Sequence, residues 1–160
     1  MPQITIEYMI MIPLLILPIF LFPLTASWIM NPWVDSRQTL ALQEIASYLG
    51  SSIHQTYSAL SHESLSEGIV TNTLEIPPSI EGQSYMGNAT LKTALGSNSS
   101  KILDINLYII DSEISVKTSV TLGDNVEWQN SSFESNSAYV NIFAEKLSSD
   151  IIRLSFGGSD

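Results

Sequence analysis

The sequence predicts an α+β protein with a long apolar helix at the amino terminus, an amphipathic helix after it and an antiparallel β-sheet in the rest of the chain. Three observations support this prediction. Residues 8–34 form an uncharged run of 27 residues. Apolar residues then recur at the period of an α-helix as far as Leu60, and from about residue 70 they alternate with polar residues between short polar turns. We therefore expect two parts, a leader with an apolar helix at 1–34 and a domain at 35–160.

The apolar run is long enough to cross a membrane, because a bilayer core of roughly 30 Å needs about 20 apolar residues in a helix. A cleavable secretory signal carries a basic head, a shorter apolar stretch and a small-residue cleavage site. Ala26-Ser27 imitates such a site, but the bulky Trp28 follows it. We expect a membrane helix that stays attached to the domain, with secretory cleavage at Ala26 or Ser27 as the alternative.

Three prolines interrupt this run at intervals of five residues, namely Pro13, Pro18 and Pro23. Each removes an amide donor and crowds the carbonyl four residues earlier, so we expect kinks or open turns. Pro32 is expected to break the helix before the next one starts. Carbonyls freed inside a membrane need to be covered by neighbouring helices, which favours a helix packed among others. The alternative is that a membrane helix tolerates these prolines by itself.

The segment at 35–60 is predicted to be an amphipathic helix, with Asp35 or Ser36 as its cap. At 100° per residue its apolar side chains fall in a stripe about 120° wide. The members of this stripe are Leu42, Ile45, Ala46, Leu49, Ile53, Tyr57 and Leu60. Such a stripe needs a sheet to cover it.

Period-2 alternation in the remaining chain supplies that sheet. The predicted strands lie at 70–76, 83–93, 103–109, 114–122, 140–144 and 152–156. The third and fourth strands are predicted to form a hairpin around Asp111-Ser112. A loop is expected from Gly123 through the sequon at Asn130. Residues 157–160 at the end of the chain are expected to fray. Short strands in immediate succession favour antiparallel pairing.

Composition excludes several classes of partner. The net charge of −10 and the pI near 4.4 argue against binding to nucleic acid or to an anionic lipid surface, because both require a basic footprint. The chain has no cysteine, which excludes a disulfide-stapled scaffold. The part after the apolar run is long enough for one domain with its own core.

No motif for catalysis or for a cofactor is visible. The only histidines, His54 and His62, are not part of a clustered metal-ligand pattern. The serines form no nucleophile elbow, and the glycines form no phosphate or dinucleotide cradle. Four carboxylates offer calcium binding as an alternative, although alternation predicts solvated strand and turn positions for them: Asp104, Asp111, Glu113 and Asp124. We expect neither an enzyme, nor a cofactor, nor a metal.

Three sequons indicate on which side of the membrane the domain lies. Asn88, Asn98 and Asn130 each begin an Asn-X-Ser/Thr acceptor pattern in a polar stretch. The positive-inside rule does not fix the orientation, because Arg37 is the only basic residue close to the apolar run. The sequons favour an extracellular domain that carries glycans at the three asparagines.

Glu7 is the only charged residue in the first 34 positions. A carboxylate at the edge of a membrane helix is costly and points to a function and a partner. Gln3, the hydroxyl residue Thr5 and Glu7 stand at intervals of two residues. This spacing resembles the class III signal peptide of archaeal type IV pilins, in which the glutamine becomes the first mature residue. Met1 and Pro2 stand where that family usually carries Lys or Arg.

The resemblance implies a route of processing and assembly. A prepilin peptidase would cut between Pro2 and Gln3 on the cytoplasmic side, leave the apolar helix attached and create an ammonium group at Gln3. Glu7 of an incoming subunit would then neutralise the Gln3 ammonium of its neighbour, and in apolar surroundings such a pair interacts far more strongly than on a surface. The helices would leave the bilayer to form the core of a homopolymeric surface filament, with the β domain outside.

Two alternatives stay open. Glu7-Tyr8 ahead of Pro13-Leu14-Leu15 resembles, almost as closely, the opening of TadE-like pseudopilins. A monomeric membrane-anchored extracellular binding domain, from a different class, explains the same hydropathy with Glu7 as an interfacial carboxylate. The sequence therefore predicts a single-pass membrane protein that serves as a structural subunit, pilin or pseudopilin, of a filament used in adhesion, with the anchored binding domain as the alternative.

Overall fold

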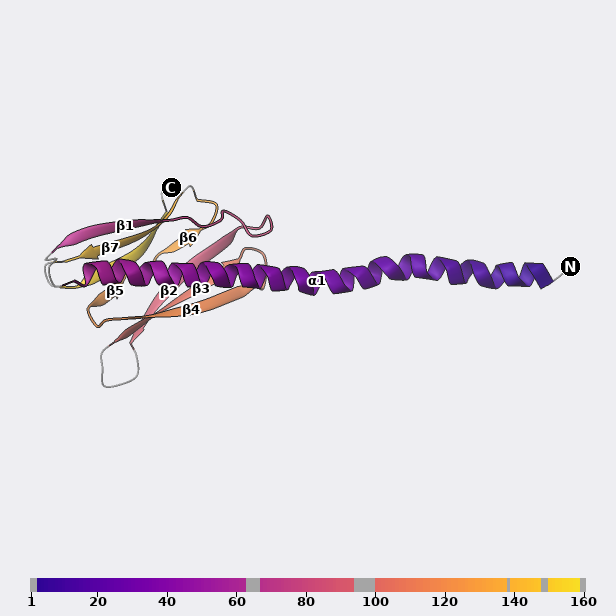
Figure 1. Ribbon diagram of the computed structural model, residues 1–160, viewed down its shortest axis with the longest axis horizontal. Coiled ribbons are helices and arrows are strands. Elements are labelled where there is room, and N and C mark those ends of the chain that lie inside the picture. Colours follow the sequence, from indigo (N-terminus) through magenta and orange to yellow (C-terminus); the bar gives the residue numbers. More distant parts are fainter. Residues whose placement is uncertain (1–2, 63–66, 94–99, 138, 148–149, 159–160) are drawn as a thin grey trace. The chain divides into compact units, whose positions relative to one another are not determined.

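The computed structural model describes residues 3–62, 67–93, 100–137, 139–147 and 150–158. These residues form one helix, α1 (Gln3–Leu60), followed by β-strands, so the fold is α+β as predicted (Figure 1). The chain divides into two compact units, Met1–Arg37 and Gln38–Asp160. The first part of α1 belongs to the first unit, and the remainder of α1 belongs to the second together with all the strands.

Four prolines lie inside α1, at Pro13, Pro18, Pro23 and Pro32, and the helix is assigned across all of them. The predicted break at Pro32 is therefore wrong, because the apolar run and the amphipathic segment belong to one helix. The Thr25 hydroxyl donates to the carbonyls of Leu21 and Phe22, at 3.0 Å each. This polar side chain is thus satisfied within its own helix and needs no partner from outside.

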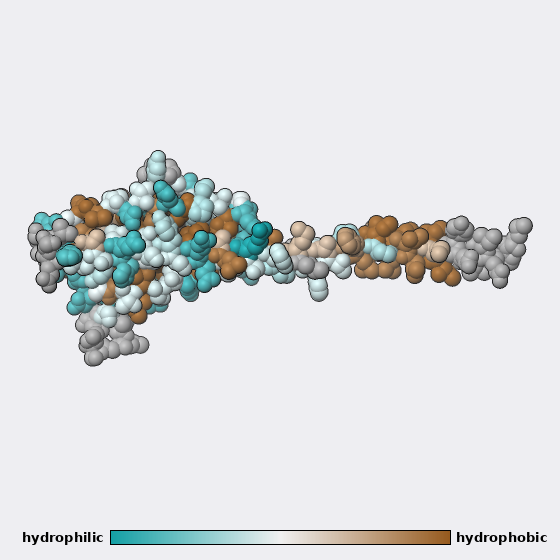
Figure 2. All heavy atoms as spheres, viewed as in Figure 1, coloured by the Kyte–Doolittle hydropathy of each residue, from teal (hydrophilic) through white to brown (hydrophobic). Residues whose placement is uncertain are grey.

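The side chains from Met9 to Thr25 are all exposed, and Figure 2 shows a largely hydrophobic surface on the helix, with paler patches between the hydrophobic ones. By length and composition this is a helix that can cross a membrane. Soluble monomers rarely expose an apolar surface of this extent, so the surface needs lipid or other protein to cover it.

The second unit contains two four-stranded sheets. The first has the order β1 (Gly68–Leu74), β7 (Val140–Lys146), β8 (Ile152–Gly158), β5 (Val126–Trp128). The second has the order β4 (Ser115–Leu122), β3 (Lys101–Ile109), β2 (Tyr85–Thr93), β6 (Ser132–Glu134). Neighbouring strands are antiparallel except for β5 and β8, which are parallel.

The predicted hairpin of β3 and β4 is confirmed, with Leu107 opposite Val116. Pairing of successive strands fails at β1 and β2, which lie in different sheets: β1 pairs with β7, and β2 pairs with β3 and β6. Pro77 and Pro78 between them have no amide hydrogen to contribute to a ladder, which is one reason that the chain leaves the first sheet here.

Two further expectations need correction. The segment after Gly123, expected as a loop, contains the three-residue strands β5 and β6. The expected fraying is wrong for Gly157 and Gly158, because β8 continues to Gly158, with Gly157 opposite Asn141 of β7. Residues 159 and 160 lie outside the described residues. The Phe143 ring covers Gly157 in the space that a side chain would need there. A neighbouring aromatic side chain thus compensates for the missing side chain of this strand glycine.

One hydrophobic core joins α1 to both sheets. The predicted stripe of α1 is confirmed as its inward face: Leu42, Leu49 and Ile53 are fully buried, and Tyr57 is partly buried. The inward positions of β3 and β7 alternate with more exposed ones, as the period-2 pattern predicts. The remainder of α1 is therefore held by its apolar stripe, and its opposite face is left uncovered.

Replacing Leu49 tests this packing. Leu49→Ala removes a side chain with no exposed surface and leaves a cavity between α1 and the sheets. We expect it to lower the free energy of unfolding by about 2–5 kcal/mol. Leu40→Ala is the matched control, because Leu40 lies on the same helix but is 63% exposed, and we expect a change within about 0.5 kcal/mol. Denaturant unfolding of the full chain in detergent measures both, and equal effects would contradict the assignment of the buried face.

Candidate assembly and modification surfaces

The residues predicted for processing and assembly lie at the start of α1. Pro2 is outside the described residues, α1 begins at Gln3, and Glu7 follows just over one helical turn later. The sequence prediction for these positions stays a prediction. Both Gln3 and Glu7 belong to α1.

Aromatic side chains are exposed where the apolar run ends. Trp28 is 87% exposed and Trp33 is 70% exposed. Trp33 lines a shallow apolar groove together with Met30, Val34 and Arg37. Tryptophan with one apolar and one polar end is typical of the boundary between lipid and water.

In the second unit the uncovered face of α1 runs between two grooves. Glu44, Ser47, Tyr48, Ser51 and His54 are exposed on this face. One groove lies between α1 and the edge strand β4. The other lies between α1 and the segment that follows β1. A ridge with a groove on each side is a surface that a second helix can pack against.

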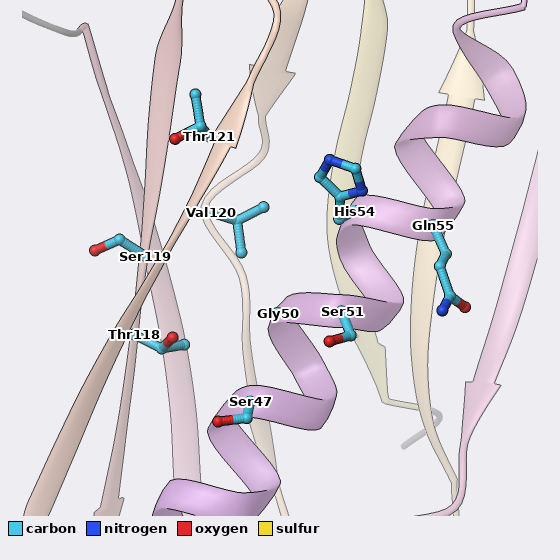
Figure 3. Close-up of a pocket in the computed structure, with 9 residues that line it drawn as sticks. All are labelled: Ser47, Gly50, Ser51, His54, Gln55, Thr118, Ser119, Val120 and Thr121. Atoms are coloured by element: carbon cyan, nitrogen blue, oxygen red, sulfur yellow. The ribbon is translucent and has the colours of Figure 1, made fainter.

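The groove beside β4 has a volume of about 630 Å³. Its lining in Figure 3 comes from α1 and β4 alone: Ser47, Gly50, Ser51, His54, Gln55, Thr118, Ser119, Val120 and Thr121. Small-molecule sites enclose most of their ligand, whereas this groove opens broadly to solvent and combines apolar surface with hydroxyl and amide groups. No carboxylate lines it beside His54, so it holds no serine-histidine-acid arrangement.

The groove on the other side of α1 is smaller and has a different chemistry. Its floor is apolar, formed by Ala41, Ile45, Ile76 and Pro77. Glu44 and Glu75 contribute carboxylates, and the side chain of Tyr48 completes the lining. An apolar floor with an acidic rim fits the aliphatic stem and charged end of a basic side chain.

The outward face of the sheet β4-β3-β2-β6 is polar. Asp104 on β3 accepts hydrogen bonds from Lys92 Nζ at 2.7 Å and from Ser119 Oγ at 2.8 Å. These two bonds hold the pKa of the Asp104 carboxyl below its ordinary value. Within the described ranges, no three His, Asp or Glu side chains are grouped so that they could hold a metal ion. The calcium cluster considered from the sequence is therefore not formed by the described residues.

The sequons occupy three different settings. Asn98 lies outside the described residues. Asn130 is exposed between β5 and β6. Asn88 is also exposed but lies in the interior of β2, where it faces Asn106 of β3 on one side and Ser132 of β6 on the other. The structure thus brings two sequons together that are 42 positions apart in the sequence.

Comparison with known proteins gives no relative for this chain: no protein family, no curated protein and no solved structure matches it. The functional argument rests on the residues and on their placement in the fold.

The charges around Asp104 predict a pH dependence. Because the folded-state pKa of Asp104 is lowered, its contribution to stability is present above the unfolded-state pKa of about 3.9 and is lost as the pH falls through the lower folded-state value. Asp104→Asn should therefore cost less than about 1 kcal/mol at neutral pH, and the difference from the parent should vanish in acid. Unfolding of both proteins between pH 7 and pH 2 measures this.

Lys92→Gln provides the control, because it removes the first of the two hydrogen-bond donors to Asp104. In that background Asp104→Asn should have a smaller effect at neutral pH. A difference between Asp104→Asn and its parent that grows as the pH falls would contradict the assignment.

Proposed function

We propose that this protein is a structural subunit of a type IV pilus-like surface filament, a pilin or pseudopilin that assembles through its N-terminal helix. The observation that carries the proposal is the spacing of Gln3, Thr5 and Glu7 directly ahead of an apolar helix. The exposure of that helix from Met9 to Thr25 supports it, because a surface of this kind is stable only against lipid or against other apolar helices.

A filament accounts for features that a single anchor does not require. Pro13, Pro18 and Pro23 each remove a backbone donor within the apolar run and leave a carbonyl without its helical partner. In a lone lipid-exposed helix such carbonyls are costly, whereas neighbouring helices can cover them. The uncovered face of α1 in the domain, with a groove on each side, offers a second surface for packing between subunits.

Glu7 would set the register between subunits. After cleavage by a prepilin peptidase, the new ammonium of Gln3 in one subunit pairs with Glu7 of the next. The two positions are four residues apart, so the pair fixes an axial displacement of about 6 Å between helices. Because the surroundings are apolar, an unpaired carboxylate at this place is strongly unfavourable, and only subunits in this register avoid it.

The two parts of a filament subunit have different locations relative to the cell. The apolar helix lies in the membrane before assembly and in the filament core afterwards. The domain lies outside the cell, as the three sequons at Asn88, Asn98 and Asn130 favour. We propose no catalytic activity and no cofactor for this protein.

Replacing Glu7 tests the proposed function. Glu7→Gln removes the charge while keeping the shape, and leaves the Gln3 ammonium of the neighbour unpaired. Breaking one partner of a buried ion pair costs about 3–5 kcal/mol, so we expect at least about a 100-fold loss in the affinity of a subunit for the filament end. The amounts of protein in the membrane fraction and in the sheared surface fraction measure this: the first should be unchanged and the second should fall to background.

Glu113→Gln is the matched control, because it makes the same chemical change at an exposed turn between β3 and β4. Its filament yield should equal that of the parent. An undiminished surface fraction in Glu7→Gln would contradict the role of Glu7. A parent protein that stays entirely in the membrane fraction under conditions of full expression would favour the monomeric anchored domain.

A further inference from the structure

Two of the three sequons form one joint site on the surface of the domain. All six of their residues line a single shallow depression: Asn88, Ala89, Thr90, Asn130, Ser131 and Ser132. Asn88 and Thr90 lie on β2, and Ser132 lies on the neighbouring strand β6. Nothing in the spacing of the sequence indicates this, because the contact depends on the pairing of two distant strands.

The register between β2 and β6 places the asparagine of each sequon near the hydroxyl residue of the other. Met86 faces Glu134, Gly87 faces Phe133, and Asn88 faces Ser132. The asparagine of the first sequon is therefore opposite the hydroxyl residue of the second. Two residues further along this antiparallel pair, Thr90 of the first sequon lies on the side of Asn130 of the second, and both line the same depression.

Side-chain packing fixes this register. The Phe133 ring occupies the space beside Gly87 that a larger residue would need, and it contacts the ring of Phe156 with centroids 5.0 Å apart. On the loop side, the Ser131 hydroxyl accepts from the Phe156 amide at 2.8 Å and donates to the Gln129 carbonyl at 2.9 Å. The two sequons are thus held side by side by the core and by the adjoining sheet.

The chemistry of N-glycosylation explains why the close placement of the two sequons affects their modification. The side-chain amide nitrogen of asparagine attacks the anomeric carbon of a glycan linked to a lipid phosphate. The bond from that carbon to the phosphate oxygen breaks, the lipid phosphate leaves with the electron pair, and the amide nitrogen gives up one proton to a base. The acceptor pattern also demands a hydroxyl two positions after the asparagine, so the transferase must reach both groups.

We propose that the sequons at Asn88 and Asn130 are mutually exclusive acceptors, so that the folded domain carries one glycan at this depression and not two. A glycan on Asn130 covers Thr90, the hydroxyl that modification of Asn88 requires. A glycan on Asn88 covers Ser132, the hydroxyl that modification of Asn130 requires. Residues directly opposite each other in an antiparallel pair have Cβ atoms only about 4.5–5.5 Å apart, which leaves no room for a transferase beside an attached sugar.

The structure also favours one of the two acceptors. Asn130 precedes β6 and lies in a connecting segment, the usual setting of a used sequon. Asn88 lies within a ladder, with β3 paired on one side and β6 on the other, so its backbone bends toward an enzyme less readily than that of Asn130. On the folded domain Asn130 is the main acceptor. This inference requires only that the domain meets a glycosyl transferase, and it stands apart from filament assembly.

Intact mass measurement of the full chain tests the inference, with expression in cells that supply a lipid-linked glycan and its transferase. Asn98→Gln is introduced in every sample to remove the third sequon. We expect a mass shift of one glycan per molecule, assigned mainly to Asn130 by peptide mapping. Adding Asn130→Gln should raise the occupancy of Asn88 above its value in the parent, because Thr90 is no longer covered.

Asn136→Gln is the control, because Asn136 is an exposed asparagine just beyond β6 that does not begin a sequon, and it should leave the pattern unchanged. Molecules that carry glycans on both Asn88 and Asn130 would overturn the inference. The same holds if Asn88 occupancy does not rise in Asn130→Gln, or if neither residue is ever modified. Filament yield is scored separately, so a failure here is distinguishable from a failure of the proposed function.

Discussion

The two parts of α1 differ in how their apolar side chains are distributed, so each part needs a different covering. The rest of the structure depends on this constraint. Along its first part α1 is apolar on every side, so lipid or other helices must cover it. Along its remainder one apolar stripe packs against the two sheets of the same chain, and Leu42, Leu49 and Ile53 of this stripe are fully buried. The change from one pattern to the other, near Arg37, is where the chain divides into its two units. The strands of the second unit thus cover the apolar stripe on the remainder of α1.

Local patterns of apolar residues in the sequence predicted the helix and most of the longer strands. The apolar stripe of α1 and the alternation in β3, β4, β7 and β8 are visible in the sequence, because burial on one face produces a period of 3.6 or of 2. The break expected at Pro32 does not occur, because a proline removes one backbone hydrogen bond and the residues around Pro32 in α1 are helical on both sides of it. β5 and β6 were missed because three residues are too few to establish a period; their partners β8 and β2 define them.

The surfaces were harder to predict than the elements. Sequence alone predicted Asn88 and Asn130 as two separate acceptors, and only the pairing of β2 with β6 places Asn88 opposite Ser132. Likewise, the two grooves beside α1 combine one helix with β4 and with the segment after β1, which are far apart in the chain. Such contacts follow from long-range register, which no short window of sequence contains. The spacing of Gln3, Thr5 and Glu7 is the opposite case: it is local, and the argument for filament assembly rests on it.

The amino-terminal residue of the mature protein is the measurement that tests this account most directly. Mass spectrometry of the membrane fraction and of the sheared surface fraction identifies it without any substitution. The account predicts a terminus at Gln3 in both fractions, because cleavage there creates the ammonium group with which Glu7 pairs. An intact Met1 in all of the protein would contradict it and favour a simple membrane anchor. A terminus after Ala26 or Ser27 would contradict it as well, since the apolar helix would then be lost and the domain released.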